Sequence, residues 1–224
     1  VALDASGKGT LTIDTQDSDV YNDSQSYEVV VTAINGGNFE NVSVDGASAT
    51  ANVTDTENET TVSLAATNTD EATQTVTFTA TLSNAVLEGD DPVVVKTTLG
   101  DITITEGTTG TLEVTNTNTE DVYQDASTLD NKITEVSGGN FEKLTADTTT
   151  TVSANIDDVN QTTTVSVSTA DVNEDANSVT FTIQTSNAPD AGESATATVT
   201  VNGVEQTVAL DASGKGTLTI DTQD

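Results

Sequence analysis

The chain has 224 residues, and its 37 acidic residues against five lysines and no arginine give a formal net charge of -32. This charge excludes nucleic-acid binding, because phosphate contacts need clustered Lys and Arg, and it excludes electrostatic docking on anionic lipid. No apolar run approaches the roughly 20 residues of a membrane helix, so we expect no membrane insertion. Cysteine and histidine are absent, which excludes disulfides, thiolate or imidazole metal sites, and His- or Cys-based catalysis.

The composition favours strands and provides few apolar residues for a core. Leu, Ile, Val and Phe together make 50 residues, about 22% of the chain and just above the roughly 20% below which a highly charged chain stays disordered. Threonine, which is β-branched and favours strands, accounts for 47 residues.

The chain repeats itself. Residues 1–17 recur without a difference as residues 208–224. Half of that spacing is about 104 residues, and shorter motifs recur near it: Asp-Val-Tyr at 19–21 and 121–123, Gly-Gly-Asn-Phe-Glu at 36–40 and 138–142, and Val-Thr-Phe-Thr at 76–79 and 179–182. The chain is therefore a tandem array of diverged units of about 104 residues.

Apolar and hydroxyl residues alternate along most of the chain, as in residues 74–82, and turn clusters separate these runs at intervals of about ten residues. The pattern predicts an all-β fold of tandem immunoglobulin-like Greek-key β-sandwiches of about 104 residues each. In the middle unit we expect strands at 60–67, 75–84, 92–98, 101–105, 110–116, 129–137 and 149–156. We expect a core of Val62, Leu64, Val76, Phe78, Leu82, Val94, Ile102, Ile104, Leu112, Val114, Ile133, Val136 and Phe141.

The order of these motifs is distinctive. Asp-Val-Tyr-Gln-Asp at 121–125 is followed by Gly-Gly-Asn-Phe-Glu at 138–142, an acidic link, and Thr-Thr-Thr-Val-Ser at 162–166. This order resembles the extender repeats of giant bacterial RTX adhesins, of the biofilm and ice-binding kinds. The resemblance implies calcium-stabilised immunoglobulin-like modules, exported by a type I system, that hold a terminal ligand-binding domain away from the bacterial cell surface.

The resemblance also implies domain boundaries, since the Thr-Thr-Val-Ser motif opens a module and the acidic link closes it. Residues 58–160 would then be a complete repeat, residues 1–57 the C-terminal part of one repeat, and residues 161–224 the N-terminal part of the next. Each part alone would leave a buried face open, and we expect neighbouring copies in the same array to complete it, either through a longer chain or by pairing between molecules. The pattern itself leaves a second phase open, with domains at 1–100 and 101–207.

The acidic residues cluster in predicted loops, where carboxylate, amide and carbonyl oxygens suit calcium. Loops at the ends of a sandwich would face the next module, so calcium there would stiffen the joint. The run 171–177 resembles the front of an EF-hand loop but lacks the glycine at the sixth position and the helices, so we expect a calcium loop of another kind. The candidate ligands are Asp19, Asp23, Asp55, Glu57, Asp70, Glu71, Asp121, Asp125, Asp157, Asp158, Asp171, Asn173, Glu174 and Asp175.

Several alternatives stay open. The acids could merely solubilise a secreted surface, although about 15 net negative charges per module would repel strongly around a small core. We expect a structural spacer and no enzyme. The alternatives are a self-assembling extracellular fibre or sheath, and a weak surface-binding or sugar-binding module, for which the seven aromatic residues are few. Tyr21 and Tyr123 are predicted to anchor a corner of the sandwich.

Overall fold

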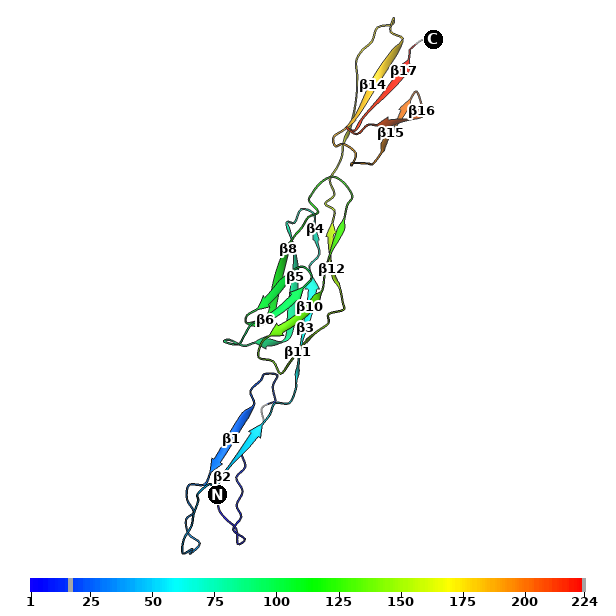
Figure 1. The fold of residues 1–224 in the computed structure, drawn as a ribbon. Coiled ribbons are helices and arrows are strands. Elements are labelled where there is room, and N and C mark those ends of the chain that lie inside the picture. Colours follow the sequence, from blue (N-terminus) through cyan, green and yellow to red (C-terminus); the bar gives the residue numbers. More distant parts are fainter. Residues whose placement is uncertain (16–17, 223–224) are drawn as a thin grey trace. The chain divides into compact units, whose positions relative to one another are not determined.

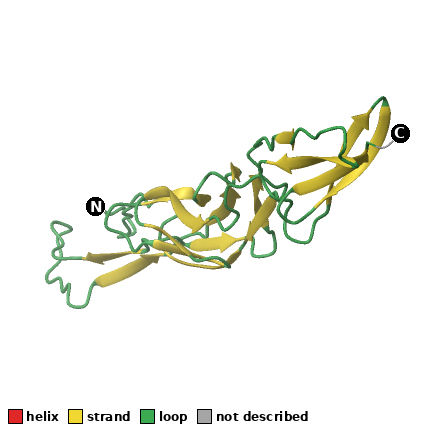
Figure 2. Ribbon diagram, turned by 90° about the horizontal axis from the view of Figure 1, so that it is seen from above, coloured by secondary structure: helices red, strands yellow, loops and turns green. Residues whose placement is uncertain are grey.

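The computed structural model describes residues 1–15 and 18–222, and these form strands joined by turns and loops, with no helix (Figure 2). The prediction of an all-β fold is confirmed, and the several sheets suit β-sandwiches. No helix in the described residues is long and apolar enough to cross a membrane.

The strands follow one another along the whole described chain (Figure 1). The first eight are β1 (Gln25–Val30), β2 (Ser48–Val53), β3 (Glu59–Ala66), β4 (Thr69–Asp70), β5 (Thr75–Val86), β6 (Val93–Thr97), β7 (Asp101–Ile104) and β8 (Gly107–Thr115). The others are β9 (Ser127–Asn131), β10 (Ile133–Gly138), β11 (Lys143–Ala146), β12 (Val152–Asp157), β13 (Val165–Thr169), β14 (Ser178–Thr185), β15 (Ala195–Val201), β16 (Val204–Leu210) and β17 (Lys215–Asp221).

The strands of the middle repeat form three sheets, with orders β10-β6-β7, β11-β3-β5-β8 and β4-β12-β9. The strands before it form the pair β1-β2, and those after it form the sheet β13-β14-β17 and the pair β15-β16. Most neighbouring strands are antiparallel, whereas β11 lies parallel to β3 and β12 lies parallel to β4. Parallel partners need long connections, so these two pairings join residues far apart in the sequence.

Contacts divide the chain into two compact units. The first comprises residues 1–66, 77–114 and 130–153, and the second comprises residues 67–76, 115–129 and 154–224. The core of the first unit is made by buried Val62, Ala80, Leu82, Val86, Val93, Val95, Ile102, Ile104, Ile133 and Phe141. The second unit buries Val76, Ala154, Ile156, Ile183 and Val208.

Two local predictions are wrong. Val93 and Val95 are fully buried and Val94 is only half-buried, because three consecutive valines carry no alternation that shows which one faces the core. The strand expected at 129–137 is divided at Lys132 into β9 and β10, and the pairing of β10 with β6 shifts register between Ile133 and Glu135. Four further residues of the predicted core are half-buried and not fully buried: Leu64, Leu112, Val114 and Val136.

The motif Gly-Gly-Asn-Phe-Glu ends β10 and turns the chain into β11. Gly138 has a φ of 84°, and a Cβ at this position would collide with the carbonyl oxygen of Pro92. Only glycine meets both demands. The turn then places Phe141 against the core, where its ring stacks on Tyr21 with 5.5 Å between ring centroids.

The duplicated segment forms the same turn in both places. Asp211 Oδ1 accepts hydrogen bonds from the Ser213 amide at 2.8 Å, the Ser213 hydroxyl at 2.6 Å and the Lys215 amide at 3.0 Å, and Asp4 does the same with Ser6 and Lys8. The Ser213 hydroxyl is the main cause that holds the pKa of Asp211 below its usual value.

This turn predicts a pH effect. The folded pKa of Asp211 is depressed, so its stabilisation is present above the unfolded pKa and is lost as the pH falls through the folded pKa. We expect Asp211→Asn to lower the melting temperature at pH 7, and the difference from the unchanged chain to shrink as the pH is lowered below 4. Melting curves at several pH values test this; a difference that stays constant down to pH 2 would contradict it. Asp4→Asn is expected to act in the same direction, because Asp4 makes the same three hydrogen bonds and the Ser6 hydroxyl lowers its pKa in the same way.

Candidate metal site

Three of the predicted ligands meet in the second unit. One carboxylate oxygen from each of Glu71, Asp121 and Asp125 lies within 4.8 Å of the other two. Glu71 comes from the turn between β4 and β5, whereas both aspartates come from the loop between β8 and β9. All three lie beside the acidic link, which contains Asp157 and Asp158.

Glu71 is the deepest member, with only 3% of its surface exposed. Its amide donates to the carbonyl of Asp157 at 3.0 Å, and its Oε1 accepts from the amide of Val159 at 2.9 Å. Its Oε2 is buried and has no hydrogen-bond partner. A buried carboxylate oxygen without a partner is costly, and two more carboxylates beside it add like-charge repulsion.

Hydrogen bonds with backbone groups hold the two aspartates in place. Asp121 Oδ1 accepts from the amide of Tyr123 at 2.7 Å. The amide of Asp125 donates to Asp158 Oδ1 at 3.1 Å. Asn118 Nδ2 donates to the carbonyl of Asp125 at 3.1 Å. The loop is therefore held in place while carboxylate oxygens stay available to a ligand.

Asn116 supports the Glu71 turn, and the sequence analysis did not identify it. The residue is buried, and its Nδ2 donates to the carbonyls of Thr73 at 2.8 Å and Asp70 at 3.3 Å. Its Oδ1 accepts from the amide of Asn118. The Asn-Thr-Asn spacing at 116–118, next to the acidic run, is the signal that could have indicated this role.

The chemistry of this group suits a hard divalent cation. Calcium takes six to eight oxygen ligands, from carboxylates and backbone carbonyls, in flexible geometry. Three carboxylates whose oxygens lie within 4.8 Å can surround one ion, which would supply the missing partner of Glu71 Oε2.

The other predicted ligands in the second unit do not join this group directly. Asp70 accepts from the Thr73 hydroxyl at 2.9 Å, and Asp157 is exposed while its backbone pairs with Asp70. Asp158 contributes only through the Asp125 amide. The run at 171–175 is exposed, and no group of three metal-ligating side chains is found there among the described residues; its predicted ligands are Asp171, Asn173, Glu174 and Asp175.

The predicted ligands in the first unit repeat part of the same arrangement. Asp19 Oδ1 accepts from the Tyr21 amide at 2.7 Å, and the amide of Asp23 donates to Asp55 Oδ2 at 3.2 Å. Glu57 instead pairs with Lys143 at 3.3 Å. The first two contacts match those of the second unit residue by residue, so this loop geometry recurs with the repeat.

The two tyrosines of the Asp-Val-Tyr motifs also make matching contacts. The Tyr21 hydroxyl donates to the carbonyl of Ala85 at 2.9 Å, and the Tyr123 hydroxyl donates to the carbonyl of Ala188 at 3.1 Å. Both alanines end a Ser-Asn-Ala motif. Each tyrosine therefore anchors its loop on a segment about 65 residues further along the chain, which is the anchoring role predicted for it.

Comparison with known proteins gives one result. A search of curated proteins finds no match. The model of the LapA domain family matches residues 2–56 and again residues 58–159, which together exceed half of the chain. The chain therefore belongs to the LapA domain family, which is related to bacterial surface adhesins.

Proposed function

We propose that this chain is an extender segment of a secreted bacterial adhesin. In this proposal immunoglobulin-like repeats stand end to end at the cell surface, calcium braces them, and they hold a terminal binding domain away from the cell. The observation that carries the proposal is the recurrence of one joint: Tyr21 and Asp19 make the same contacts as Tyr123 and Asp121. A spacer needs one joint used repeatedly, whereas a binding module needs a distinctive surface.

The repeat unit in this proposal is residues 58–160. Its support is that β3, near the start of the unit, pairs with β11, near its end, and that the family matches change over at residues 56–58. Calcium is the proposed cation, and the support for it is the carboxylate group around buried Glu71.

The joint can be tested by scattering. Asp158 Oδ1 holds the Asp125 amide, and Asp157 lies beside it at the end of β12. We expect replacement of both aspartates by alanine to make the chain more flexible in calcium while the sheets stay folded. Small-angle scattering reports the first property and circular dichroism the second.

The matched control is Glu113→Ala with Glu205→Ala. It removes the same charge from two exposed strand residues away from the link. Scattering profiles that stay equally extended in both variants would count against a calcium-braced joint.

A further inference from the structure

One five-residue loop occurs twice in the chain, as Asp-Val-Tyr-x-Asp at residues 19–23 and at residues 121–125. We call both copies the tyrosine loop. In the repeat unit proposed above, each copy belongs to one repeat, and its tyrosine hydroxyl donates to an alanine carbonyl of the repeat that follows. The tyrosine loop therefore makes contacts in two neighbouring repeats.

In the first unit, the tyrosine loop packs on the core of the repeat that follows it. Val20 and Tyr21 lie against the buried apolar cluster of the middle repeat. The ring of Tyr21 stacks on Phe141, and the backbones of these two residues form an antiparallel bridge. The amide of Glu142 donates to the carbonyl of Val20 at 3.0 Å. A segment of one repeat thus supplies two side chains to the core of the next.

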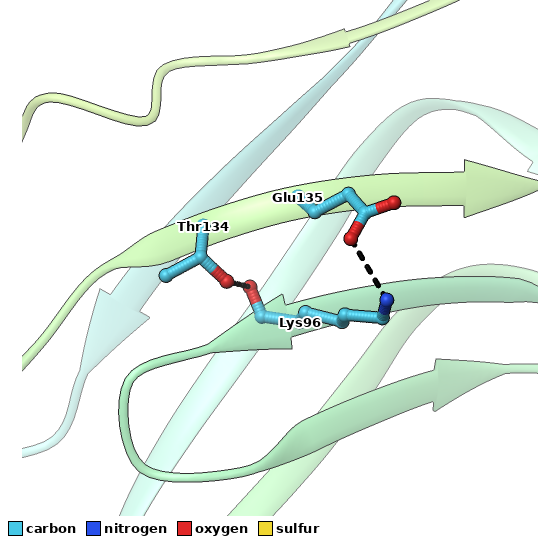
Figure 3. Close-up of polar contacts among 3 residues, drawn as sticks. All are labelled: Lys96, Thr134 and Glu135. Carbon is cyan, nitrogen blue, oxygen red and sulfur yellow. Dashed lines mark hydrogen bonds and ion pairs between the residues drawn. The ribbon is translucent and has the colours of Figure 1, made fainter.

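The middle repeat holds its own side of this contact in place. Phe141 follows β10, and β10 pairs with β6. Lys96 Nζ of β6 lies 2.8 Å from the Glu135 carboxylate of β10, and the Thr134 hydroxyl donates to the Lys96 carbonyl at 3.1 Å (Figure 3). These contacts do not involve the tyrosine loop, so the surface that receives Tyr21 is formed by the middle repeat itself.

In the second unit, the same loop also takes part in the carboxylate group. Asp121 and Asp125, its first and last residues, meet Glu71 of the repeat to which the loop belongs. Tyr123 lies between them in the sequence, and its hydroxyl donates to the carbonyl of Ala188 in the next repeat at 3.1 Å. One short loop is thus shared between a candidate metal site in its own repeat and a contact with the next repeat.

A cation in the carboxylate group would act directly on this loop. The carboxylates of Glu71, Asp121 and Asp125 repel one another, and the Oε2 of Glu71 is buried with no hydrogen-bond partner. A divalent cation replaces this repulsion by attraction at the first and fifth residues of the loop. Because only three residues separate the two aspartates, the position of Tyr123 depends on both.

We infer that the tyrosine loop couples neighbouring repeats: a divalent cation in the carboxylate group of one repeat orders the loop, and the ordered loop stabilises the following repeat through its tyrosine. The coupling is reciprocal in free energy, so the tyrosine contact tightens cation binding by the same factor. The part played by the cation rests on the function proposed above, whereas the tyrosine contact does not depend on it.

A coupling of this kind suits an array of repeats. The stability of a repeat protein is approximately the sum of the intrinsic stabilities of its repeats and the interface terms between nearest neighbours. Here the interface term depends on the cation, so calcium is expected to stabilise the two repeats on either side of a joint together. The repeat boundary at residue 58 is then a boundary in sequence but not in folding, because Tyr21 packs on the core of the middle repeat.

Hydrogen exchange of the whole chain tests the tyrosine contact. Tyr21→Ala is expected to speed the exchange of amides 143–146 in β11 several-fold, because β11 packs on the same core. It is expected to leave amides 183–186 unchanged. Tyr123→Ala is expected to do the reverse, because its hydroxyl contact lies in the next repeat. Equal effects of both variants on both segments, or no effect of Tyr21→Ala on amides 143–146, would overturn the inference.

Two further variants serve as matched comparisons. Tyr21→Phe keeps the ring that stacks on Phe141 and loses the hydroxyl bond to Ala85, so a smaller effect is expected in the same segment, amides 143–146. Tyr27→Ala removes the third tyrosine of the chain, whose hydroxyl donates to nearby Gln25 in β1. Tyr27→Ala is expected to change neither segment.

The coupling itself is tested by measuring calcium binding and hydrogen exchange on the same proteins. Millimolar calcium is expected to slow the exchange of amides 183–186 several-fold in the unchanged chain, relative to chelator. Glu71→Gln and Tyr123→Phe are each expected to lose most of this slowing. In calorimetry, Tyr123→Phe is expected still to bind calcium, with an affinity lowered by the factor that the slowing has lost.

The two measurements separate the two proposals. If calorimetry detects no calcium binding to the unchanged chain, both the calcium proposal and the coupling are wrong. If calcium binds and Tyr123→Phe keeps the full slowing at amides 183–186, the coupling is wrong and the calcium proposal stands.

Discussion

Calcium at millimolar concentration is expected to raise the melting temperature of this chain, and Glu71→Gln is expected to remove most of that gain. A ligand that binds only the folded state stabilises it by about 2.7 kcal/mol when its concentration is 100 times the dissociation constant. Extracellular calcium sites have dissociation constants of about 10⁻⁴ to 10⁻³ M. At the tighter end of that range, 10 mM calcium gives the ratio for which this stabilisation is expected. A gain of that size corresponds to a shift of several degrees.

The sign of the Glu71→Gln effect should reverse with calcium. Without the ion, Glu71 carries a buried oxygen with no partner beside two other carboxylates, so the neutral amide is expected to melt at a higher temperature than the unchanged chain. With the ion, the unchanged chain is expected to melt higher, because the glutamine lacks the charge that calcium needs. Thermal melts of both proteins in 10 mM calcium and in chelator measure all four values.

The control for this experiment is Glu113→Gln, an exposed residue in β8. It removes the same charge and is expected to show no reversal. If the unchanged chain melts identically in calcium and in chelator, the calcium proposal is wrong, whatever the variants do.

Strands with clean alternation could be predicted from the sequence. In β5 the residues Val76, Phe78 and Leu82 face inward as expected, because apolar and hydroxyl residues alternate there without interruption. The run of three valines in β6 has no alternation, so its inward face depended on pairing with β7 and β10. Strand β11 was missed because its four residues are a strand only through their parallel pairing with β3.

The sequence predicted the chemistry of the candidate site but not which residues form it. Acidic loops indicated calcium chemistry, but sequence cannot show that Glu71 meets two aspartates about 50 residues away. The run at 171–175 has more carboxylates, and it offered the stronger pattern, yet it is exposed. Glu71 is set apart by its burial and by the Val159 amide, both of which depend on the acidic link folding back beside the turn. The shared position of Glu71 and Glu174 in the repeat is the sequence signal that could have singled it out.

The largest loss of stability from one side chain is expected at Phe78. This ring is fully buried in β5, and Phe→Ala substitutions in a packed core typically cost about 3–5 kcal/mol, because the cavity left behind refills only in part. We expect Phe78→Ala to shift the chemical denaturation midpoint of the middle repeat by a corresponding amount. Far-ultraviolet circular dichroism in a urea series measures it.

Phe181 is the matched comparison, since it holds the same place in the Val-Thr-Phe-Thr motif but is only half-buried, on the wall of an open groove. In dilute protein Phe181→Ala is expected to cost clearly less than Phe78→Ala, because less surface was removed from water to begin with. If Phe181→Ala is as costly as Phe78→Ala, the difference in burial between the two rings does not set the cost of the substitution, and this prediction is wrong.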